Sequence, residues 1–329
     1  MRAIHPYEPG SPDPRLSDLP EPAPGPGEVL VAVRAAGLNH ADLHQLRGAY
    51  PPPPGESLIP GLECAGTVLA LGEGVEGAER DALFAPGARV MALVAGGAHA
   101  ERAAIPVDQL MPIPQSLSFV EAAAVPEAGL TAWTNLVVEG GLEAGESVLV
   151  TGATGGMGTM FVQLAKELGA RVIAAARSRE RLEGLRALGA DEVALLDDEL
   201  PARVRAATGG RGADLVIELA GGAGINRRLA ALAVRGRLVL VGLLAGRRAE
   251  IDLDVVLARR LRVQGSVLRA RSRAEKSALV AAFAAFALPR FASGRLRPVV
   301  DRALPFERAP EAYAALARGG VGGKIVLEL

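Results

Sequence analysis

The sequence predicts an α/β protein in which a doubly wound parallel sheet is combined with a second, mostly β domain. From about residue 121 to residue 268, apolar β-type runs alternate with helical patterns, as in parallel sheets covered by helices on both faces. The first of these runs enters a glycine-rich turn that opens a helix. Residues 1–120 instead contain short β-type runs among many prolines and glycines, which indicates a mostly β domain.

Length and composition fit a soluble globular protein. A chain of 329 residues is long enough for two domains. A composition of 50% hydrophobic and 22% charged residues is ordinary for globular proteins. The net charge of −1 argues against a nucleic-acid or membrane surface as a partner. The single cysteine, Cys64, excludes an intramolecular disulfide and fits a reducing compartment.

The N-terminus is polar and rich in proline, which predicts no signal peptide. The longest apolar run, 238–245, is too short to cross a membrane. We therefore expect a cytoplasmic protein. Most cationic residues are arginines, and the lysines are Lys166, Lys276 and Lys324.

In the first domain, strands are expected at 28–33 and 66–70, and Pro51 to Pro54 predict a rigid loop. In the second domain, six strands are expected, at 147–152, 171–176, 191–196, 213–219, 237–243 and 261–268. One helix follows the glycine-rich turn and ends near Gly169, and further helices are expected at 179–188, 200–208 and 225–234. Gly189 is the predicted C-cap of the helix at 179–188.

The C-terminal residues predict a helix at 271–287, a strand near 301–304, a helix at 307–317 and a final strand at 323–329. This tail most simply returns to the first domain. The expected organisation is therefore a first domain at 1–120, a parallel-sheet domain at 121–268 and a C-terminal return at 269–329.

The glycine-rich turn is the most informative motif. Its sequence is GATGGMG at 152–158, between a strand and a helix. In this context glycines let the backbone approach a dinucleotide pyrophosphate, and the helix N-terminus supplies N–H donors. The alternative, a glycine-rich turn without a ligand, remains open because the spacing departs from G-x-G-x-x-G. The candidate cofactor-binding residues are Thr154, Gly155, Gly156, Met157 and Gly158.

The end of the second strand bears on the choice of dinucleotide. An acid about 20 residues beyond the turn usually accepts hydrogen bonds from the ribose 2′-hydroxyl of NAD. Here Ala176 is followed by Arg177 and Ser178, with Arg181 nearby. These side chains can bind a 2′-phosphate, which predicts NADPH. The alternative is that the arginines form an ordinary solvated segment.

Several segments occur in a characteristic order along the chain: GLNHADL at 37–43, GAYPPP at 48–53, PGLECAGTV at 60–68, VPEAGLTA at 125–132, the glycine-rich turn, and GGKIVL at 322–327. Together they resemble the medium-chain dehydrogenase/reductases, specifically their zinc-free quinone oxidoreductase (zeta-crystallin-like) branch. Within that branch, Asn39, YPPP at 50–53 and SVLRAR at 266–271 resemble the tumour-suppressor-inducible quinone oxidoreductase subgroup. The resemblance implies a Rossmann domain together with a GroES-like substrate domain.

The resemblance also implies a site without metal. Asn39 and Leu62 stand where the zinc alcohol dehydrogenases have a zinc-binding Cys and His, and the chain lacks the four cysteines of the structural zinc lobe. His40 and His44 stand four residues apart on an expected helix, so a different metal site remains conceivable. A third ligand is not evident, and we expect no metal.

By resemblance, the nicotinamide is expected between the two domains. The residues expected to line it or to lie near the cofactor are Thr131, Gly221, Gly242, Leu243, Leu268 and Lys324. Lys324 can equally be a surface lysine, and Leu196 replaces a tyrosine that relatives often place against the cofactor. Asn39 and Tyr50 are candidates to orient the acceptor carbonyl or the nicotinamide ribose, although Tyr50 can also be a packing residue.

The leading functional hypothesis is an NADPH-dependent quinone oxidoreductase, because a quinone delocalises the incoming charge and needs little beyond correct positioning. Reduction of an activated C=C bond in enones or enoyl thioesters is the first alternative. A non-catalytic NADPH-binding protein is the second. The resemblance further implies a homodimer formed through the sixth strand, at 262–267.

Overall fold

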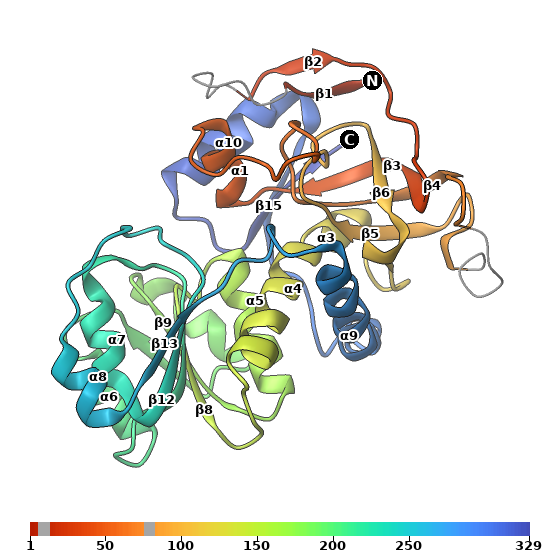
Figure 1. Ribbon diagram of the computed structural model, residues 1–329. Coiled ribbons are helices and arrows are strands. Elements are labelled where there is room, and N and C mark those ends of the chain that lie inside the picture. The colour runs from red at the N-terminus through yellow and green to blue at the C-terminus, as the bar shows by residue number, and fades with distance from the viewer. Residues whose placement is uncertain (6–13, 76–82) are drawn as a thin grey trace. The chain divides into compact units, whose positions relative to one another are not determined.

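The computed structural model describes residues 1–5, 14–75 and 83–329. The chain divides into two compact units (Figure 1). Unit 1 comprises Met1–Leu130 and Arg269–Leu329, and unit 2 comprises Thr131–Leu268. The pattern of the sequence changes near residue 120, but the division lies at residue 130 because α3 (Phe119–Ala123) packs on strands of unit 1.

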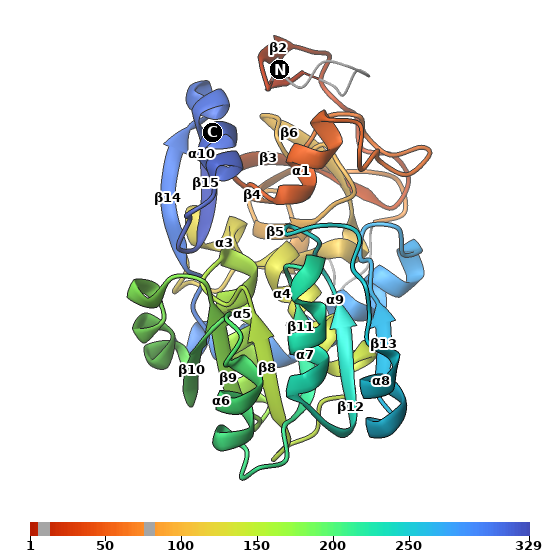
Figure 2. The same ribbon diagram turned by 90° about the vertical axis from the view of Figure 1, so that its left-hand side faces the viewer.

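Unit 2 contains a six-stranded sheet in the order β10-β9-β8-β11-β12-β13, and all neighbours are parallel. Figure 2 shows these strands fanned out with α6 and α7 in front of them. The predicted doubly wound sheet is therefore confirmed. Its strands are β8 (Ser147–Thr151), β9 (Arg171–Ala176), β10 (Glu192–Leu195), β11 (Ala213–Glu218), β12 (Leu232–Leu240) and β13 (Arg262–Gly265).

The helices of unit 2 follow the strands alternately. They are η2 (Thr134–Glu139, a π-helix), α5 (Gly156–Glu167), the 3-10 helices η3 (Arg179–Arg181), η4 (Glu183–Leu188) and η5 (Gly222–Gly224), and α6 (Leu200–Ala207), α7 (Ile225–Ala231) and α8 (Leu253–Arg259). The single helix predicted at 179–188 is wrong, because the segment forms two 3-10 helices. It does end at Gly189, which has a left-handed φ of 105°.

The helix predicted at 225–234 also runs too far. Leu232 is already extended, with φ −72° and ψ 149°, and it pairs with Ala213 as the first residue of β12. The register then shifts, so that Leu215 pairs with Arg237. Arg235 at φ 65° lies within this shift. The local sequence is helical, and pairing with β11 overrides it.

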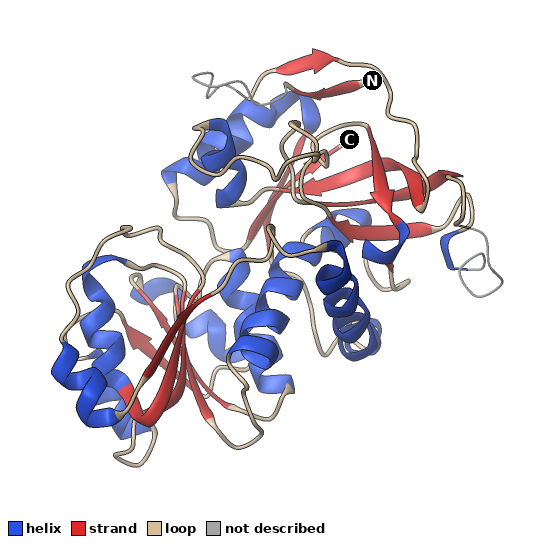
Figure 3. Cartoon of the chain, viewed as in Figure 1, coloured by secondary structure: helices blue, strands red, loops and turns tan. Residues whose placement is uncertain are grey.

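Unit 1 contains a seven-stranded sheet in the order β14-β15-β3-β4-β5-β7, with β6 paired to β3. The strands of the chain are drawn in red in Figure 3. A separate two-stranded sheet pairs β1 with β2. The C-terminal strand β15 is inserted between β14 and β3, so the tail completes the N-terminal sheet. The strands are β1 (Arg2–Ile4), β2 (Leu16–Asp18), β3 (Glu28–Gly37), β4 (Glu63–Leu71), β5 (Arg89–Leu93), β6 (Arg102–Pro106), β7 (Leu110–Pro112), β14 (Val300–Pro305) and β15 (Lys324–Glu328).

The helices of unit 1 whose bounds fall within the described residues are α1 (His40–Leu46), η1 (Val107–Gln109), α3, α4 (Pro126–Trp133, whose last residues belong to unit 2), α9 (Arg273–Ala292), η6 (Phe306–Arg308) and α10 (Ala309–Arg318). Helix α9 begins with a capping box of Ser272 and Glu275 and is longer than the expected helix at 271–287. Pro289 lies in its last turns. No helix within the described residues is long and apolar enough to span a membrane.

Candidate functional site

The glycine-rich turn of unit 2 connects β8 to α5. Gly152 adopts φ 63°, in the left-handed region that favours glycine. A Cβ on Gly158 would collide with the backbone of Gly152 and Ala153, so only glycine allows the helix to begin this close to the strand. The Thr151 hydroxyl donates to the Ile217 carbonyl at 3.2 Å and ties this turn to the end of β11.

The N-terminus of α5 fits a phosphate group. Its N-cap residue, Gly155, provides no capping side chain, and the first turn contains no acidic residue. The first backbone N–H groups of a helix have no acceptor within the helix, and the helix dipole favours an anion beside them. Gly155, Gly156, Met157 and Gly158 therefore lie where a pyrophosphate could be held. Thr154 stands beside them in the turn.

The end of β9 lacks an acidic side chain. Arg177 and Arg181 are exposed and Ser178 is half-buried. Within the part of the chain that the structure describes, neither guanidinium forms a hydrogen bond or ion pair. Two free cations beside a hydroxyl are suited to a phosphate.

A buried ion pair holds the loop that follows β11. Glu218 is fully buried, and its Oε2 accepts a hydrogen bond of 2.9 Å from Arg228 Nε. Its Oε1 accepts from the amides of Ala220 and Gly221 at 2.8 and 2.7 Å. Gly242 is required nearby, because a Cβ there would collide with the Leu219 carbonyl.

Other predicted cofactor residues of unit 2 differ in burial. Thr131 is buried, and its carbonyl accepts from Asn135 Nδ2 at 2.7 Å. Leu268 is buried, whereas Leu243 is 48% exposed. Their contact with a cofactor stays a prediction.

A buried polar network lies in unit 1 around Asn39. The Asn39 amide donates through Nδ2 to Glu63 Oε1 at 2.9 Å and accepts through Oδ1 from Lys324 Nζ at 2.6 Å. Lys324 also forms an ion pair with Glu63, and Glu63 Oε2 accepts from the Glu127 amide at 2.9 Å. These contacts fix which end of the amide is oxygen. One Nδ2–H of Asn39 remains for another acceptor.

The backbone around Asn39 is fixed by a second carboxylate. Asn39 caps α1, and its backbone amide donates to Asp42 Oδ2 at 2.7 Å. Asp42 Oδ1 accepts from the Gly61 amide at 3.1 Å. Gly61 has φ 104° and immediately precedes Leu62. Asp42 therefore joins the two segments that carry ligands in zinc-binding relatives.

This donor set does not fit zinc. One replaced position holds Asn39, whose side-chain amide is hydrogen-bonded to the Lys324 ammonium and the Glu63 carboxylate. The other position holds the buried apolar side chain of Leu62. Zinc sites use Cys, His or carboxylate ligands in a tight shell. Over residues 1–5, 14–75 and 83–329, no group of three such side chains could hold a metal ion, and His40 and His44 on α1 gain no third ligand.

Tyr50 and Arg269 form a second polar group in unit 1. Arg269 is buried and donates from Nε, Nη1 and Nη2 to the Ala95 carbonyl, the Tyr50 carbonyl and Gln45 Oε1, at 2.7, 3.0 and 2.6 Å. Its guanidinium also lies over the Tyr50 ring, 5.2 Å from the centroid. The loop that carries Tyr50 is therefore tied to two other segments of unit 1.

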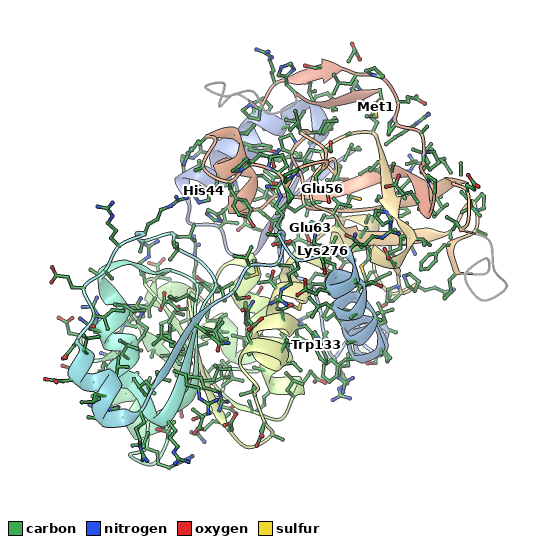
Figure 4. All side chains as sticks on the ribbon, viewed as in Figure 1. Met1, His44, Glu56, Glu63, Trp133 and Lys276 are labelled. Carbon is green, nitrogen blue, oxygen red and sulfur yellow. The ribbon has the colours of Figure 1, made fainter. Side chains whose placement is uncertain are left out.

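Glu127 and Lys276 are two further ionisable residues of unit 1. Burial, and then the charge of Glu63, raise the pKa of the Glu127 carboxyl to about 7. Burial lowers the pKa of Lys276. Figure 4 labels Glu63, Glu56 and Lys276 in unit 1. Cys64 beside Glu63 is inert, because burial raises the pKa of its thiol to about 12.

The structure brings Asn39 and Lys324 together, although the sequence suggests Lys324 as a cofactor residue and Asn39 as an acceptor residue. Glu63, Glu127, Arg269 and Lys276 were not among the predicted site residues. One signal could have found Lys276: in a chain rich in arginine, a lysine stands on the apolar side of a helical pattern. The other three become functional candidates only through contacts between distant segments.

Comparison with known proteins agrees with this architecture. Residues 25–115 match the alcohol dehydrogenase GroES-like domain, and residues 156–285 match a family described as zinc-binding dehydrogenase. The quinone oxidoreductase of Lama guanicoe is 31% identical over 335 residues, covering 100% of this chain and 98% of that protein. Prostaglandin reductase-3 of Bos taurus is 34% identical over 73% of this chain and 62% of its own length.

A longer relative is the spectinabilin polyketide synthase system protein NorB of Streptomyces orinoci, which is 36% identical over 95% of this chain. The chain spans only 14% of the length of that protein. Among solved structures, the quinone oxidoreductase of Thermus thermophilus, also described in complex with NADPH, is 39% identical with a TM-score of 0.83 and 100% coverage of both chains. The chain belongs to the medium-chain dehydrogenase/reductase superfamily, as an oxidoreductase with quinone oxidoreductases among its relatives.

Proposed function

We propose that this chain is an NADPH-dependent quinone oxidoreductase that works without zinc. The observation that carries the proposal is the network around Asn39, in which the amide at one replaced zinc-ligand position is hydrogen-bonded to the Lys324 ammonium and the Glu63 carboxylate. The similarity to quinone oxidoreductases over the whole chain supports it. The single buried thiol fits a cytoplasmic location.

NADPH, when bound, supplies the hydride. The backbone of the glycine-rich turn and the N-terminus of α5 hold its pyrophosphate, and Arg177, Ser178 and Arg181 bind its 2′-phosphate. Asn39 orients the acceptor carbonyl or the nicotinamide ribose with its remaining Nδ2–H. Tyr50, held by Arg269, forms part of the acceptor site.

Zinc is dispensable for this reaction because of the acceptor. Reduction of an ordinary carbonyl creates a localised alkoxide that needs a metal or an acid. A quinone spreads the charge over an aromatic hydroquinone anion, which water can protonate. The protein then contributes mainly the geometry of approach.

Reduction of an activated C=C bond is a second candidate, favoured by the similarity to prostaglandin reductase-3. Purified protein is to be mixed with NADPH and either 1,4-benzoquinone or an α,β-unsaturated ketone, and the NADPH absorbance followed. We expect a higher kcat/KM with the quinone. A higher kcat/KM with the ketone would establish the second candidate, and tight NADPH binding without turnover of either class would establish a non-catalytic role.

We further propose a homodimer formed through β13. This strand is at the edge of the unit 2 sheet, where no other described strand pairs with its outer backbone N–H and C=O groups. Val263 on it and Val267 beyond it are 38% and 52% exposed, and Leu253 and Leu257 of α8 are 72% and 78% exposed. A second copy can cover this apolar surface.

A further inference from the structure

Lys276 occupies a position on α9 where an apolar side chain is expected. The buried residues Val280, Phe283 and Ala287 follow it at spacings of four, seven and eleven, which places all of them on one face of the helix. Lys276 itself is 5% exposed. Lysines are rarely this buried without a partner.

The Lys276 ammonium has no partner among the residues that the structure describes. Within the described residues, none lies at hydrogen-bond or ion-pair distance from it, whereas Lys324 pairs with Glu63 and Lys166 with Asp191. A buried, unpaired ammonium carries a large desolvation penalty. Such a group indicates a site that a ligand completes.

The surroundings of Lys276 are mixed in charge. Burial and the nearby Arg269 lower the pKa of Lys276, while Glu56 and Glu127 raise it. Arg269 is in turn the residue that holds Tyr50. Lys276 therefore belongs to the same polar region of unit 1 as the candidate acceptor residue.

The position of Lys276 is fixed by packing. Gly129 of α4 lies against the Phe283 ring of α9, and a Cβ on Gly129 would collide with that ring. Glu127 stands two residues before Gly129, and Lys276 stands two helical turns before Phe283. The contact between Gly129 and Phe283 thus sets how far the backbone of Glu127 on α4 lies from the backbone of Lys276 on α9.

We propose that Lys276 binds the oxygen of the acceptor that becomes negatively charged on reduction. This inference rests on the proposed function. NADPH loses a hydride and becomes NADP⁺, and the acceptor gains that hydride and keeps one anionic oxygen. The oxygen is a phenolate after quinone reduction and an enolate after C=C reduction. The ammonium donates a hydrogen bond to it, and water supplies the final proton.

The kinetic test compares Lys276→Met and Lys276→Arg with Lys166→Met as control. We expect Lys276→Met to lower kcat/KM for the acceptor roughly 10- to 100-fold, as for loss of one charge-assisted hydrogen bond. KM for NADPH should not change, and Lys276→Arg should restore part of the loss. The melting temperature of Lys276→Met should be equal or higher, because an unpaired buried charge is removed. A lowered melting temperature with weakened NADPH binding would show a structural role instead.

A binding test separates this inference from the proposed function. The phenolate of 4-nitrophenol resembles the reduced acceptor and is followed by its visible absorbance. We expect wild type and Lys166→Met to bind it about tenfold more tightly than Lys276→Met. Equal binding by all three, or full acceptor turnover by Lys276→Met, would overturn the role of Lys276. Failure of wild type to reduce any acceptor, with Lys276-dependent phenolate binding intact, would overturn only the proposed function.

Discussion

Lys324 Nζ donates a hydrogen bond of 2.6 Å to Asn39 Oδ1 across a separation of 285 residues. The sheet register explains the contact. Strand β15 pairs antiparallel with β3, with Val326 opposite Gly37. Lys324 lies two residues before Val326 and Asn39 two residues after Gly37, so the same register sets them opposite one another. The C-terminal strand therefore supplies the cation of the Asn39 network.

Replacing Lys324 by Met should destabilise the protein strongly. The Glu63 carboxylate is fully buried, and without the ammonium its charge is only partly compensated. Breaking a buried ion pair typically costs about 3–5 kcal/mol. The free energy of unfolding measured in urea should fall by about that amount.

Lys166→Met is the matched control for that measurement. Lys166 pairs with Asp191, but its side chain is 45% exposed. Exposed pairs contribute about 0–1 kcal/mol. Equal losses for Lys166→Met and Lys324→Met would show that the buried pair does not stabilise unit 1.

Zinc should be absent from the purified protein and without effect on its activity. Asn39 and Leu62 provide neither a thiolate nor an imidazole, and the Asn39 amide is already bonded on both sides. Elemental analysis should find far less than one zinc per chain, and EDTA should leave turnover unchanged. About one zinc per chain together with EDTA-sensitive turnover would contradict the zinc-free mechanism.

The parts of the molecule that depend on local sequence could be predicted best. The expected strand at 171–176 is β9, and the expected glycine-rich turn does connect β8 to α5, because both follow from nearby residues. The helix predicted through 234 failed because pairing with β11 takes over at Leu232. The contacts of Glu63 with Asn39, Glu127 and Lys324 depend on three distant segments, and no single-segment pattern contains them.

Glu127 should make stability depend on pH. Its carboxyl has a pKa of about 7 in the folded protein, against 4.5 for an unperturbed glutamate. Between these values the folded chain holds a proton that the unfolded chain has lost. The free energy of unfolding should therefore fall as pH rises from 4.5 to 7, by on the order of 2–3 kcal/mol.

Glu127→Gln tests this dependence because it cannot titrate. Urea unfolding of both proteins at several pH values between about 5 and 8 should show the variant gaining stability relative to wild type as pH rises. Parallel pH profiles for the two proteins would mean that Glu127 titrates normally.

Assembly through β13 should be visible in sedimentation. Wild type should be a dimer at micromolar concentration, because the exposed edge strand and the apolar side chains of Leu253 and Leu257 are covered by a second copy. Val263→Lys should weaken the dimer by placing a charge on the edge strand. Exposed Leu58 of unit 1, changed to Lys, is the control and should leave the dimer intact. A wild type that sediments only as a monomer would contradict the proposal.

Cofactor preference should follow from the end of β9. No acid is present there to accept from a ribose 2′-hydroxyl, while Arg177, Ser178 and Arg181 offer donors to a 2′-phosphate. One charge-assisted hydrogen bond contributes about 1.5–3 kcal/mol, so NADPH should bind at least about tenfold more tightly than NADH. Arg177→Ala or Arg181→Ala should weaken the binding of NADPH with little effect on the binding of NADH, and Ser178→Asp should reverse the preference.

Arg171→Ala is the control for these variants. Arg171 lies at the opposite end of β9 and is paired with Glu192, so its replacement should change neither affinity. Equal binding of the two dinucleotides by wild type, or equal effects of the arginine variants on both, would show that the 2′-phosphate is bound elsewhere or not at all.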